Sequence, residues 1–232
     1  ITLQEFLSTD RLGNRPVDLV DLSVAIDAAA TAVASLAPID NPMSAPGTTL
    51  SGVMVLRTAE GPYWLSFNVG DSRVYVVGGG GIRQLTHDHS ALQEARDLAA
   101  TSGAPRVIPP ANVVTKALGA GQTGSVKADY TIMPLEEGDR AVICTDGVHG
   151  VLRDSQIHAV VAAGDGPQGT ADALVRASLE SVTRDNTTAV VVYAGTKSRV
   201  TLTTNVMNRM IQPVRPASIE TARRVPRREG SN

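Results

Sequence analysis

The stretch Arg140-Ala141-Val142-Ile143-Cys144-Thr145-Asp146-Gly147 has the pattern of a buried strand that ends in an acidic turn. The residues before Asp146 are mostly apolar or β-branched, which is typical of a strand covered on both faces. Such a strand holds its last residue rigidly, while the end of the strand opens to solvent. Asp146 is therefore a candidate functional carboxylate.

Two other aspartates stand at the ends of expected strands. Asp71 follows a strand that ends at Val69, and Asp185 precedes a strand that begins at Thr188. Strand ends on one rim can bring together carboxylates that are distant in sequence, and these stay ionised only with cations between them. Oxygen ligands without Cys or His favour Mg²⁺ or Mn²⁺. Each aspartate alone also fits an ordinary turn, so this prediction depends on all three together.

The remaining pattern mixes helices and short strands without a regular βαβ alternation. Apolar residues at helical spacing predict helices over 17–36, 91–100, 154–163 and 170–182, with Asp154 as the N-cap of the third. Short β-branched runs predict strands over 49–56, 63–69, 73–77, 82–85, 130–133 and 188–193. We therefore expect an α+β layer arrangement of stacked antiparallel sheets with helices outside, rather than a doubly wound parallel sheet.

The composition of the 232 residues excludes several classes of protein. Hydrophobic residues make up 42% and charged residues 19%, which excludes wholesale disorder. The net charge of −2 gives no global attraction to nucleic acid or anionic lipid, and 3% aromatic residues disfavour stacking on bases. Cys144 is the only cysteine, which excludes an intrachain disulfide and a cysteine-cluster zinc site. No apolar run approaches the roughly 18 residues of a membrane span.

The composition changes after Gly195. Residues 196–232 are rich in Arg and contain Glu220 and Glu229 as their only acidic residues, and three prolines interrupt any helix. We expect one folded domain over 1–195 and a basic, flexible tail over 196–232. The tail is interpreted as a solvated extension or as a docking segment for an acidic partner, with nucleic acid the least favoured.

Seven short motifs follow one another along the chain: Gly47-Thr48-Thr49-Leu50, Gly70-Asp71-Ser72-Arg73-Val74-Tyr75, Leu85-Thr86-His87-Asp88-His89-Ser90, Val114-Thr115-Lys116-Ala117-Leu118-Gly119, Gly138-Asp139-Arg140, Cys144-Thr145-Asp146-Gly147-Val148 and Arg184-Asp185-Asn186-Thr187-Thr188-Ala189-Val190. In this order and spacing they resemble the bacterial type 2C metal-dependent protein serine/threonine phosphatases over residues 1–195. The resemblance implies an α-β-β-α sandwich of two antiparallel sheets flanked by helices.

The resemblance also implies a chemistry. By position, Asp146 and Asp185 match the ligands of two catalytic Mn²⁺ or Mg²⁺ ions, and Asp71 with Asp146 matches the ligands of a third. In the family a metal-activated water attacks the phosphorus of phosphoserine or phosphothreonine in line, without a phosphoenzyme and with no catalytic side chain beyond the metal ligands. We expect phosphorylated proteins and a serine/threonine kinase as partners, no nucleic acid or membrane, and a cytoplasmic monomer.

Two motifs of the family are missing from this sequence. They are an Arg…Asn-Glu-Asp stretch and Asp-Gly-x-Gly-Gly-His, whose Asp bridges the metals, and both precede the segment that 1–7 resembles. The sandwich is therefore expected to lack its first strands, either because an upstream segment is absent or because a relative lost catalysis and serves as a scaffold for a phosphoprotein or kinase. The retained aspartates favour the first explanation. These 232 residues alone are expected to bind metal weakly, to hydrolyse little, and to aggregate through an open sheet edge.

Five other residues have side chains that a functional site could use. His89, with His87, can form a His-x-His metal pair, but the start of a loop after a strand favours a capping or packing role for His89. His149 is expected to be a turn residue, with a role near phosphate as the alternative. Cys144 and Trp64 are expected to be buried, and a nucleophilic cysteine would need a basic environment.

Overall fold

The computed structural model describes residues 17–38, 40, 45–102, 108–110, 112–120, 125–195 and 222–224. The chain divides into two compact units. The first comprises 1–50, 68–71 and 88–129, and the second comprises 51–67, 72–87 and 130–232. Asp71 therefore belongs to the first unit, whereas Asp146 and Asp185 belong to the second.

Two four-stranded sheets lie in the second unit, apart from end residues of three strands. One sheet has the order β5-β4-β8-β9, with the strands Gly81–Gln84, Arg73–Gly78, Arg140–Cys144 and Ala189–Tyr193, and all its pairs are antiparallel. The other has the order β10-β7-β3-β2, with the strands Ala222–Arg224, Asp129–Pro134, Gly61–Val69 and Leu50–Thr58. Strand β10 runs parallel to β7 and comes from the expected tail, whose other residues lie outside the described part.

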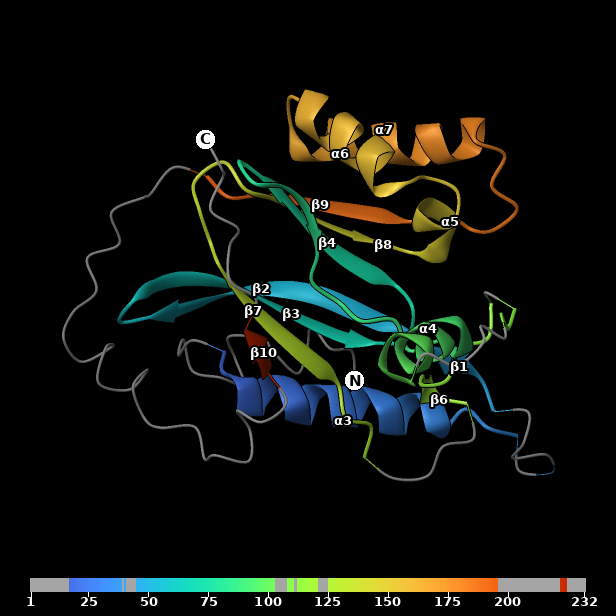
Figure 1. Ribbon diagram of the computed structural model, residues 1–232. Coiled ribbons are helices and arrows are strands. Elements are labelled where there is room, and N and C mark those ends of the chain that lie inside the picture. The colour runs from blue at the N-terminus through green and yellow to red at the C-terminus, as the bar shows by residue number, and fades with distance from the viewer. Residues whose placement is uncertain are drawn as a thin grey trace. The chain divides into compact units, whose positions relative to one another are not determined.

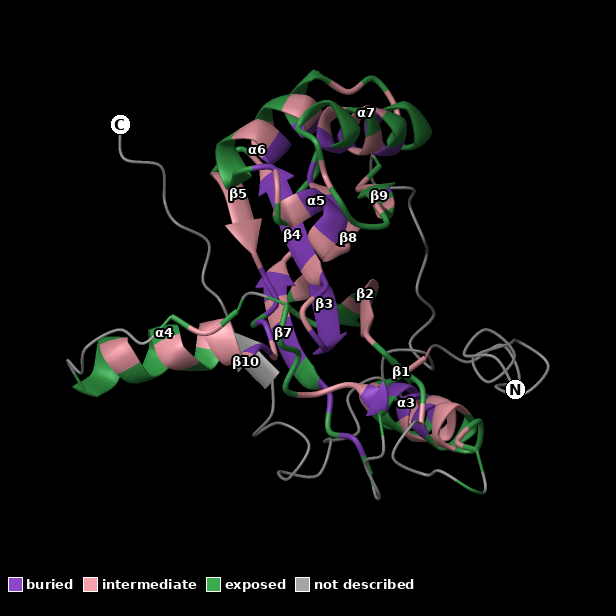
Figure 2. Cartoon of the chain, turned by 90° about the vertical axis from the view of Figure 1, so that its right-hand side faces the viewer, coloured by how far each residue is buried: buried purple, intermediate pink, exposed green. Residues whose placement is uncertain are grey.

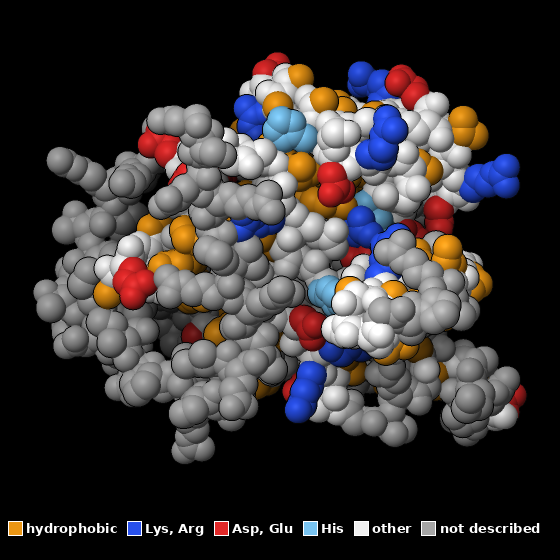
Figure 3. All heavy atoms as spheres, in the orientation of Figure 1, with side chains coloured by type: hydrophobic (Ala, Val, Ile, Leu, Met, Phe, Trp, Pro, Cys, Tyr) orange, Lys and Arg blue, Asp and Glu red, His pale blue; other side chains and the backbone are white. Residues whose placement is uncertain are grey.

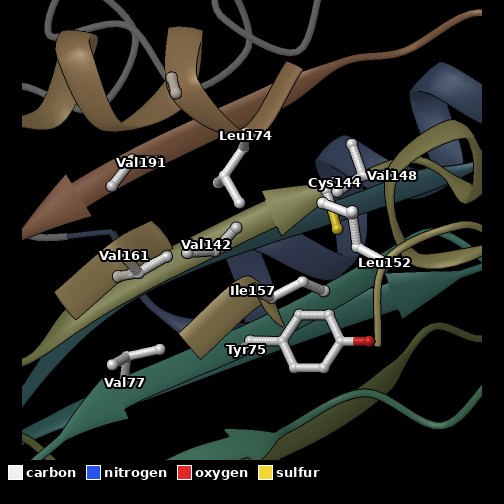
Figure 4. Packing of buried hydrophobic residues seen from close by; sticks show 11 residues of the cluster. Tyr75, Val77, Val142, Cys144, Val148, Leu152, Ile157, Val161, Leu174 and Val191 are labelled. Carbon is white, nitrogen blue, oxygen red and sulfur yellow. The ribbon is translucent and has the colours of Figure 1, made fainter. Parts of the chain in front are cut away.

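Alternating side chains give the sheet β5-β4-β8-β9 two apolar faces. The core between the two sheets contains Trp64, Val74, Val76, Leu85, Met133 and Ala141. The core on the opposite face contains Tyr75, Val77, Val142, Cys144, Val148, Leu152, Ile157, Val161, Ala171, Leu174 and Val191 (Figure 4). Burial on both faces explains the nearly unbroken apolar run of β8.

Helices α6 (Asp154–Ala163) and α7 (Pro167–Glu180) cover the second of these faces (Figure 1). Over these helices, acidic, basic and hydrophobic side chains are interspersed (Figure 3). The N-cap of α6 is Arg153 rather than Asp154, so that prediction was wrong. The reason is that the Gln156 side chain accepts a hydrogen bond from the Arg153 N–H at 3.0 Å, which places Asp154 inside the first turn.

The first unit contains α3 (Leu19–Ala34), α4 (Ala91–Ser102) and the short pair β1 (Gly47–Thr48) and β6 (Leu118–Gly119). Asp18 caps α3 by accepting hydrogen bonds from the N–H groups of the first turn. In α4 no residue is buried, as Figure 2 shows. The structure thus confirms the expected α+β class, and the predicted helices and strands agree with it within a few residues; β1, β6, β10 and a short helix after β8 were not predicted.

Strand β9 is the last in its sheet order, and it exposes apolar side chains on one face. Val190 is 52% exposed and Val192 is 38% exposed.

Among the described residues, none of the helices has the length and apolar character that crossing a bilayer requires.

A buried carboxylate in the turn between β7 and β8 forms a hydrogen bond with a side chain of strand β3. Asp139 is 1% exposed, and its Oδ2 accepts hydrogen bonds from Trp64 Nε1 at 3.1 Å and from the Glu136 N–H at 2.9 Å. Gly138 has a positive φ of 84°, which the turn requires just before Asp139. The predicted core position of Trp64 is confirmed, and its indole N–H also satisfies a buried charge.

We expect Trp64→Phe to lower the free energy of unfolding by about 2–3 kcal/mol, because it removes a donor from a buried carboxylate and also leaves buried space where the larger indole was. The measurement is urea denaturation at neutral pH. Tyr63→Phe is the matched control: it removes a hydroxyl that donates to the exposed Glu60 at 3.0 Å, and should cost less than about 1 kcal/mol. Equal losses in the two variants would contradict a special role for the Trp64–Asp139 bond.

Candidate functional site

Asp146 opens the short helix α5 (Asp146–His149), directly after β8. Thr145 occupies the N-cap position with an extended backbone, φ −81° and ψ 170°. The chain therefore changes from buried strand to helix within one residue, and Asp146 remains half-buried at that point. The sequence predicted a turn here; the structure forms a helix, and His149 is its last residue.

Asp185 lies in the loop between α7 and β9 and is exposed. Its Oδ1 accepts a hydrogen bond from the following N–H, that of Asn186, at 2.7 Å. This local bond orients the carboxylate toward the backbone of its own loop. The remaining acceptor sites of the two carboxylate oxygens can serve a cation or water.

The loop that carries Asp185 is hydrogen-bonded to the loop that carries Asp146. The Thr145 N–H donates to the Thr188 carbonyl oxygen at 3.1 Å, and the Thr188 N–H donates to Thr145 Oγ1 at 3.1 Å. Thr145 Oγ1 in turn donates to the Asn186 carbonyl oxygen at 3.3 Å. The structure thus brings together the two loops that carry two of the three predicted ligands.

Gly147 allows the two loops to approach each other closely. A Cβ atom at this position would lie 2.2 Å from the Asn186 carbonyl oxygen, which is backbone and cannot easily shift. Any other residue would push the loops apart. Thr145 and Gly147 therefore both shape the site, and the sequence reasoning assigned a role to neither. The signal available for Thr145 was a hydroxyl residue placed between a buried strand and an acidic residue.

In the first unit, Asp71 follows a tightly constrained glycine. Gly70 has φ of 111°, and a Cβ there would lie 2.3 Å from Thr49 Cγ2. The Gly70 N–H donates to His89 Nδ1 at 2.9 Å, and the His89 N–H donates to the Gly70 carbonyl oxygen at 2.9 Å. His89 therefore holds the residue before Asp71 at two points, which is the packing role predicted for it.

The hydrogen bond from Gly70 also determines the tautomer of His89. A backbone N–H can only donate, so Nδ1 is unprotonated and the hydrogen of the neutral ring lies on Nε2. Nε2 lies 3.1 Å from Asp129 Oδ2, and Lys116 Nζ lies 3.1 Å from Asp129 Oδ1. The hydrogen bond from His89, with that from Lys116, lowers the pKa of Asp129 to about 2. Both ring nitrogens of His89 are engaged, which leaves neither for a metal.

The donor chemistry of the Asp146 and Asp185 loops fits a hard divalent cation. Carboxylate oxygens suit Mg²⁺ and Mn²⁺, and Mg²⁺ is commonly held by one or two carboxylates with water in its remaining positions. Within the described ranges, no group of three His, Cys, Asp or Glu residues could hold a metal ion. The residues present therefore fit a hydrated ion on two carboxylates rather than a closed cage, in keeping with the bridging aspartate that the sequence lacks.

Comparison with known proteins gives consistent matches. The family model described as protein phosphatase 2C matches residues 3–183. The serine/threonine phosphatase stp of Listeria welshimeri is 26% identical over 147 residues, which are 63% of this chain and 56% of that protein. The chain thus spans little more than half the length of that relative.

Solved structures show the same fold. The serine/threonine phosphatase of S. agalactiae aligns with a TM-score of 0.66 and 25% identity, covering 83% of this chain and 79% of that one. The catalytic domain of the phosphatase PstP, solved in complex with two manganese ions, aligns with a TM-score of 0.64 and 24% identity. This alignment covers 82% of this chain and 77% of that one.

The hydrogen bonds that Asp129 accepts from His89 and Lys116 predict a pH dependence of stability. Because the pKa of Asp129 is about 2 in the folded state against 3.8 ordinarily, its ionised form stabilises the fold above about pH 4, and this contribution is lost as the pH falls toward about 2. Asp129→Asn should therefore be less stable than the wild type above about pH 4, with a difference that shrinks below it. Urea denaturation across this range measures it; a difference independent of pH would refute the assignment.

Proposed function

Because the chain belongs to the protein phosphatase 2C family, we propose that the protein removes phosphate from phosphoserine and phosphothreonine in other proteins, in a reaction that depends on Mn²⁺ or Mg²⁺. The observation that carries this proposal is the hydrogen-bonded pair of loops that presents Asp146 and Asp185 beyond the ends of β8 and β9. The name of the Listeria relative and the manganese complex of PstP support it.

In this proposal Asp146 and Asp185 hold the catalytic ions, and Asp71 is a ligand of a third ion. When bound, the ions would lower the pKa of a water and offset the charge of the phosphate group. The protein's own contribution is to hold the carboxylates on loops that the β8–β9 pairing keeps in place. This arrangement places the loops before any ligand arrives, so less ordering is required on binding.

A covalent mechanism through Cys144 has no support in the geometry. Its side chain is 2% exposed and packs against Val148 and Leu152 in the core beneath the helices (Figure 4). A thiol in apolar surroundings is a poor nucleophile and is shielded from a phosphoprotein. Water is therefore the proposed nucleophile, and phosphorylated proteins, together with the serine/threonine kinase that produces them, are the proposed partners.

A second candidate function is binding without hydrolysis, as a phosphatase-like scaffold for a phosphoprotein or kinase. One observation favours it: among the described residues, no group of three or more His, Cys, Asp and Glu residues could hold a metal ion. The two candidates predict opposite results in an assay of the full-length protein with metal.

We expect the full-length protein, meaning this chain together with any segment that its gene encodes before Ile1, to hydrolyse p-nitrophenyl phosphate and a phosphothreonine peptide when Mn²⁺ is present. Thorough chelation with EDTA should abolish the activity, and added Mn²⁺ should restore it, because the proposed nucleophile is a water activated by the metal. Activity that persists after chelation would exclude the metal-dependent reaction. Peptide binding without turnover at saturating Mn²⁺ would favour the scaffold.

Substitution of the aspartates should separate their roles. Asp146→Asn and Asp185→Asn each remove a charge from the proposed catalytic pair and should lower turnover at least about 100-fold, whereas Asp71→Asn should mainly weaken the third ion. Asp172→Asn is the matched control, since it removes an exposed charge on α7 whose Oδ1 accepts a hydrogen bond from Gln168 Nε2 at 2.8 Å. Near-normal turnover of Asp146→Asn at saturating Mn²⁺ would overturn the assignment.

A further inference from the structure

Thr145 uses its backbone and its side chain for two different structures. It holds the N-cap position of α5, yet its hydroxyl makes no hydrogen bond to that helix. Its carbonyl oxygen accepts hydrogen bonds from the helix, as at any N-cap, from the Val148 N–H at 3.0 Å and the His149 N–H at 3.4 Å. A hydroxyl at an N-cap ordinarily satisfies an N–H of the first turn, so its diversion elsewhere requires a reason.

The reason lies in the register of β8 and β9. Cys144 pairs with Ala189, so the next pair in this register is Thr145 with Thr188. A hydrogen-bonded antiparallel pair exchanges two backbone bonds. Here the Thr145 N–H donates to the Thr188 carbonyl oxygen, but the Thr188 N–H finds Thr145 Oγ1 in place of a backbone carbonyl. The hydroxyl therefore completes the ladder while the carbonyl begins the helix.

The same hydroxyl makes a second bond across the site. It donates to the Asn186 carbonyl oxygen at 3.3 Å, so one oxygen holds the backbone on both sides of Thr187. Asp146 is covalently next to Thr145, and Asp185 is next to Asn186. One path from one carboxylate to the other thus passes through this side-chain oxygen. A second, longer contact runs through Thr187 Oγ1, which lies 3.5 Å from the Gly147 carbonyl oxygen and 3.3 Å from the Asp185 carbonyl oxygen.

We propose that the Thr145 hydroxyl is a positioning group that sets the distance between the Asp146 and Asp185 carboxylates and thereby the affinity for the metal. This inference rests on the proposed function. Asn186 and Thr188 are exposed, so water can replace the lost hydrogen bonds at little cost in stability. Water cannot hold two loops at a fixed separation, so the loss falls on metal binding rather than on folding.

Three variants of the full-length protein test this, with Mn²⁺ affinity measured by calorimetry and the free energy of unfolding by urea. Thr145→Val keeps the shape without the hydroxyl and should weaken Mn²⁺ binding about tenfold with little loss of stability. Thr145→Ser keeps the oxygen and should retain most of the affinity. Thr145→Ala takes the place of the valine variant if that variant does not fold.

Thr170→Val supplies the opposite case. Thr170 is fully buried on α7, and its hydroxyl donates to the Gly166 carbonyl oxygen at 2.8 Å and contacts Tyr193 Oη at 2.6 Å, at the far end of β9. Its loss should lower stability more than the loss at Thr145 but leave Mn²⁺ affinity unchanged. Equal loss of affinity in both variants would show a general effect of stability and overturn the inference.

Two further results would overturn it: Thr145→Val with wild-type affinity, or Thr145→Ser as weak as Thr145→Val. If the wild type binds Mn²⁺ but hydrolyses no phosphopeptide, the proposed function fails, while the measured affinities still decide the role of Thr145. If the wild type binds no Mn²⁺, both are refuted.

Discussion

The second unit depends on the burial of both faces of the sheet β5-β4-β8-β9. In β8, Ala141 faces the core between the sheets, whereas Val142 and Cys144 face the core under the helices. A slip of one residue in the pairing would exchange the two sets and put wrong volumes into both cores. The register of β8 is therefore fixed from two sides, with Cys144 held between Arg73 and Ala189.

The fixed register of β8 also limits the position of the proposed site, because Thr145 and Asp146 directly follow the last residue of this strand. Cys144 is 2% exposed, whereas Asp146, two positions later, is only half-buried, so part of its side chain is open to solvent. Each residue beyond a fixed strand adds only a few degrees of freedom, which the bonds of Thr145 and the close approach of Gly147 remove. Two carboxylates on such loops keep their positions before any ligand binds, which is what the proposed metal site requires.

Much of this was predictable from local pattern. The apolar runs of β3, β4, β8 and β9 and the burial of Trp64 and Cys144 follow from periodicity and residue type, which local sequence records directly. Elements of two residues, such as β1 and β6, carry no period and depend on contacts remote in sequence. The cap of α6 was misassigned because Asp154 is a good cap by type, whereas the side chain that decides is Gln156, three residues beyond the cap.

The convergence of the Asp146 and Asp185 loops was predictable only in outline. Strand ends on one rim suggested that their carboxylates could meet, but the atoms that join the loops belong to Thr145, Asn186, Thr187 and Thr188. The types of these residues do not indicate which groups their hydroxyls and carbonyls will bind. A threonine after a strand has several ways to use its hydroxyl, and capping α5 was the locally favoured one. The hydroxyl binds β9 instead of capping α5, because the register of β8 and β9 places the Thr188 N–H next to it. The register between β8 and β9, which depends on residues distant in sequence, therefore determines which groups the Thr145 hydroxyl binds.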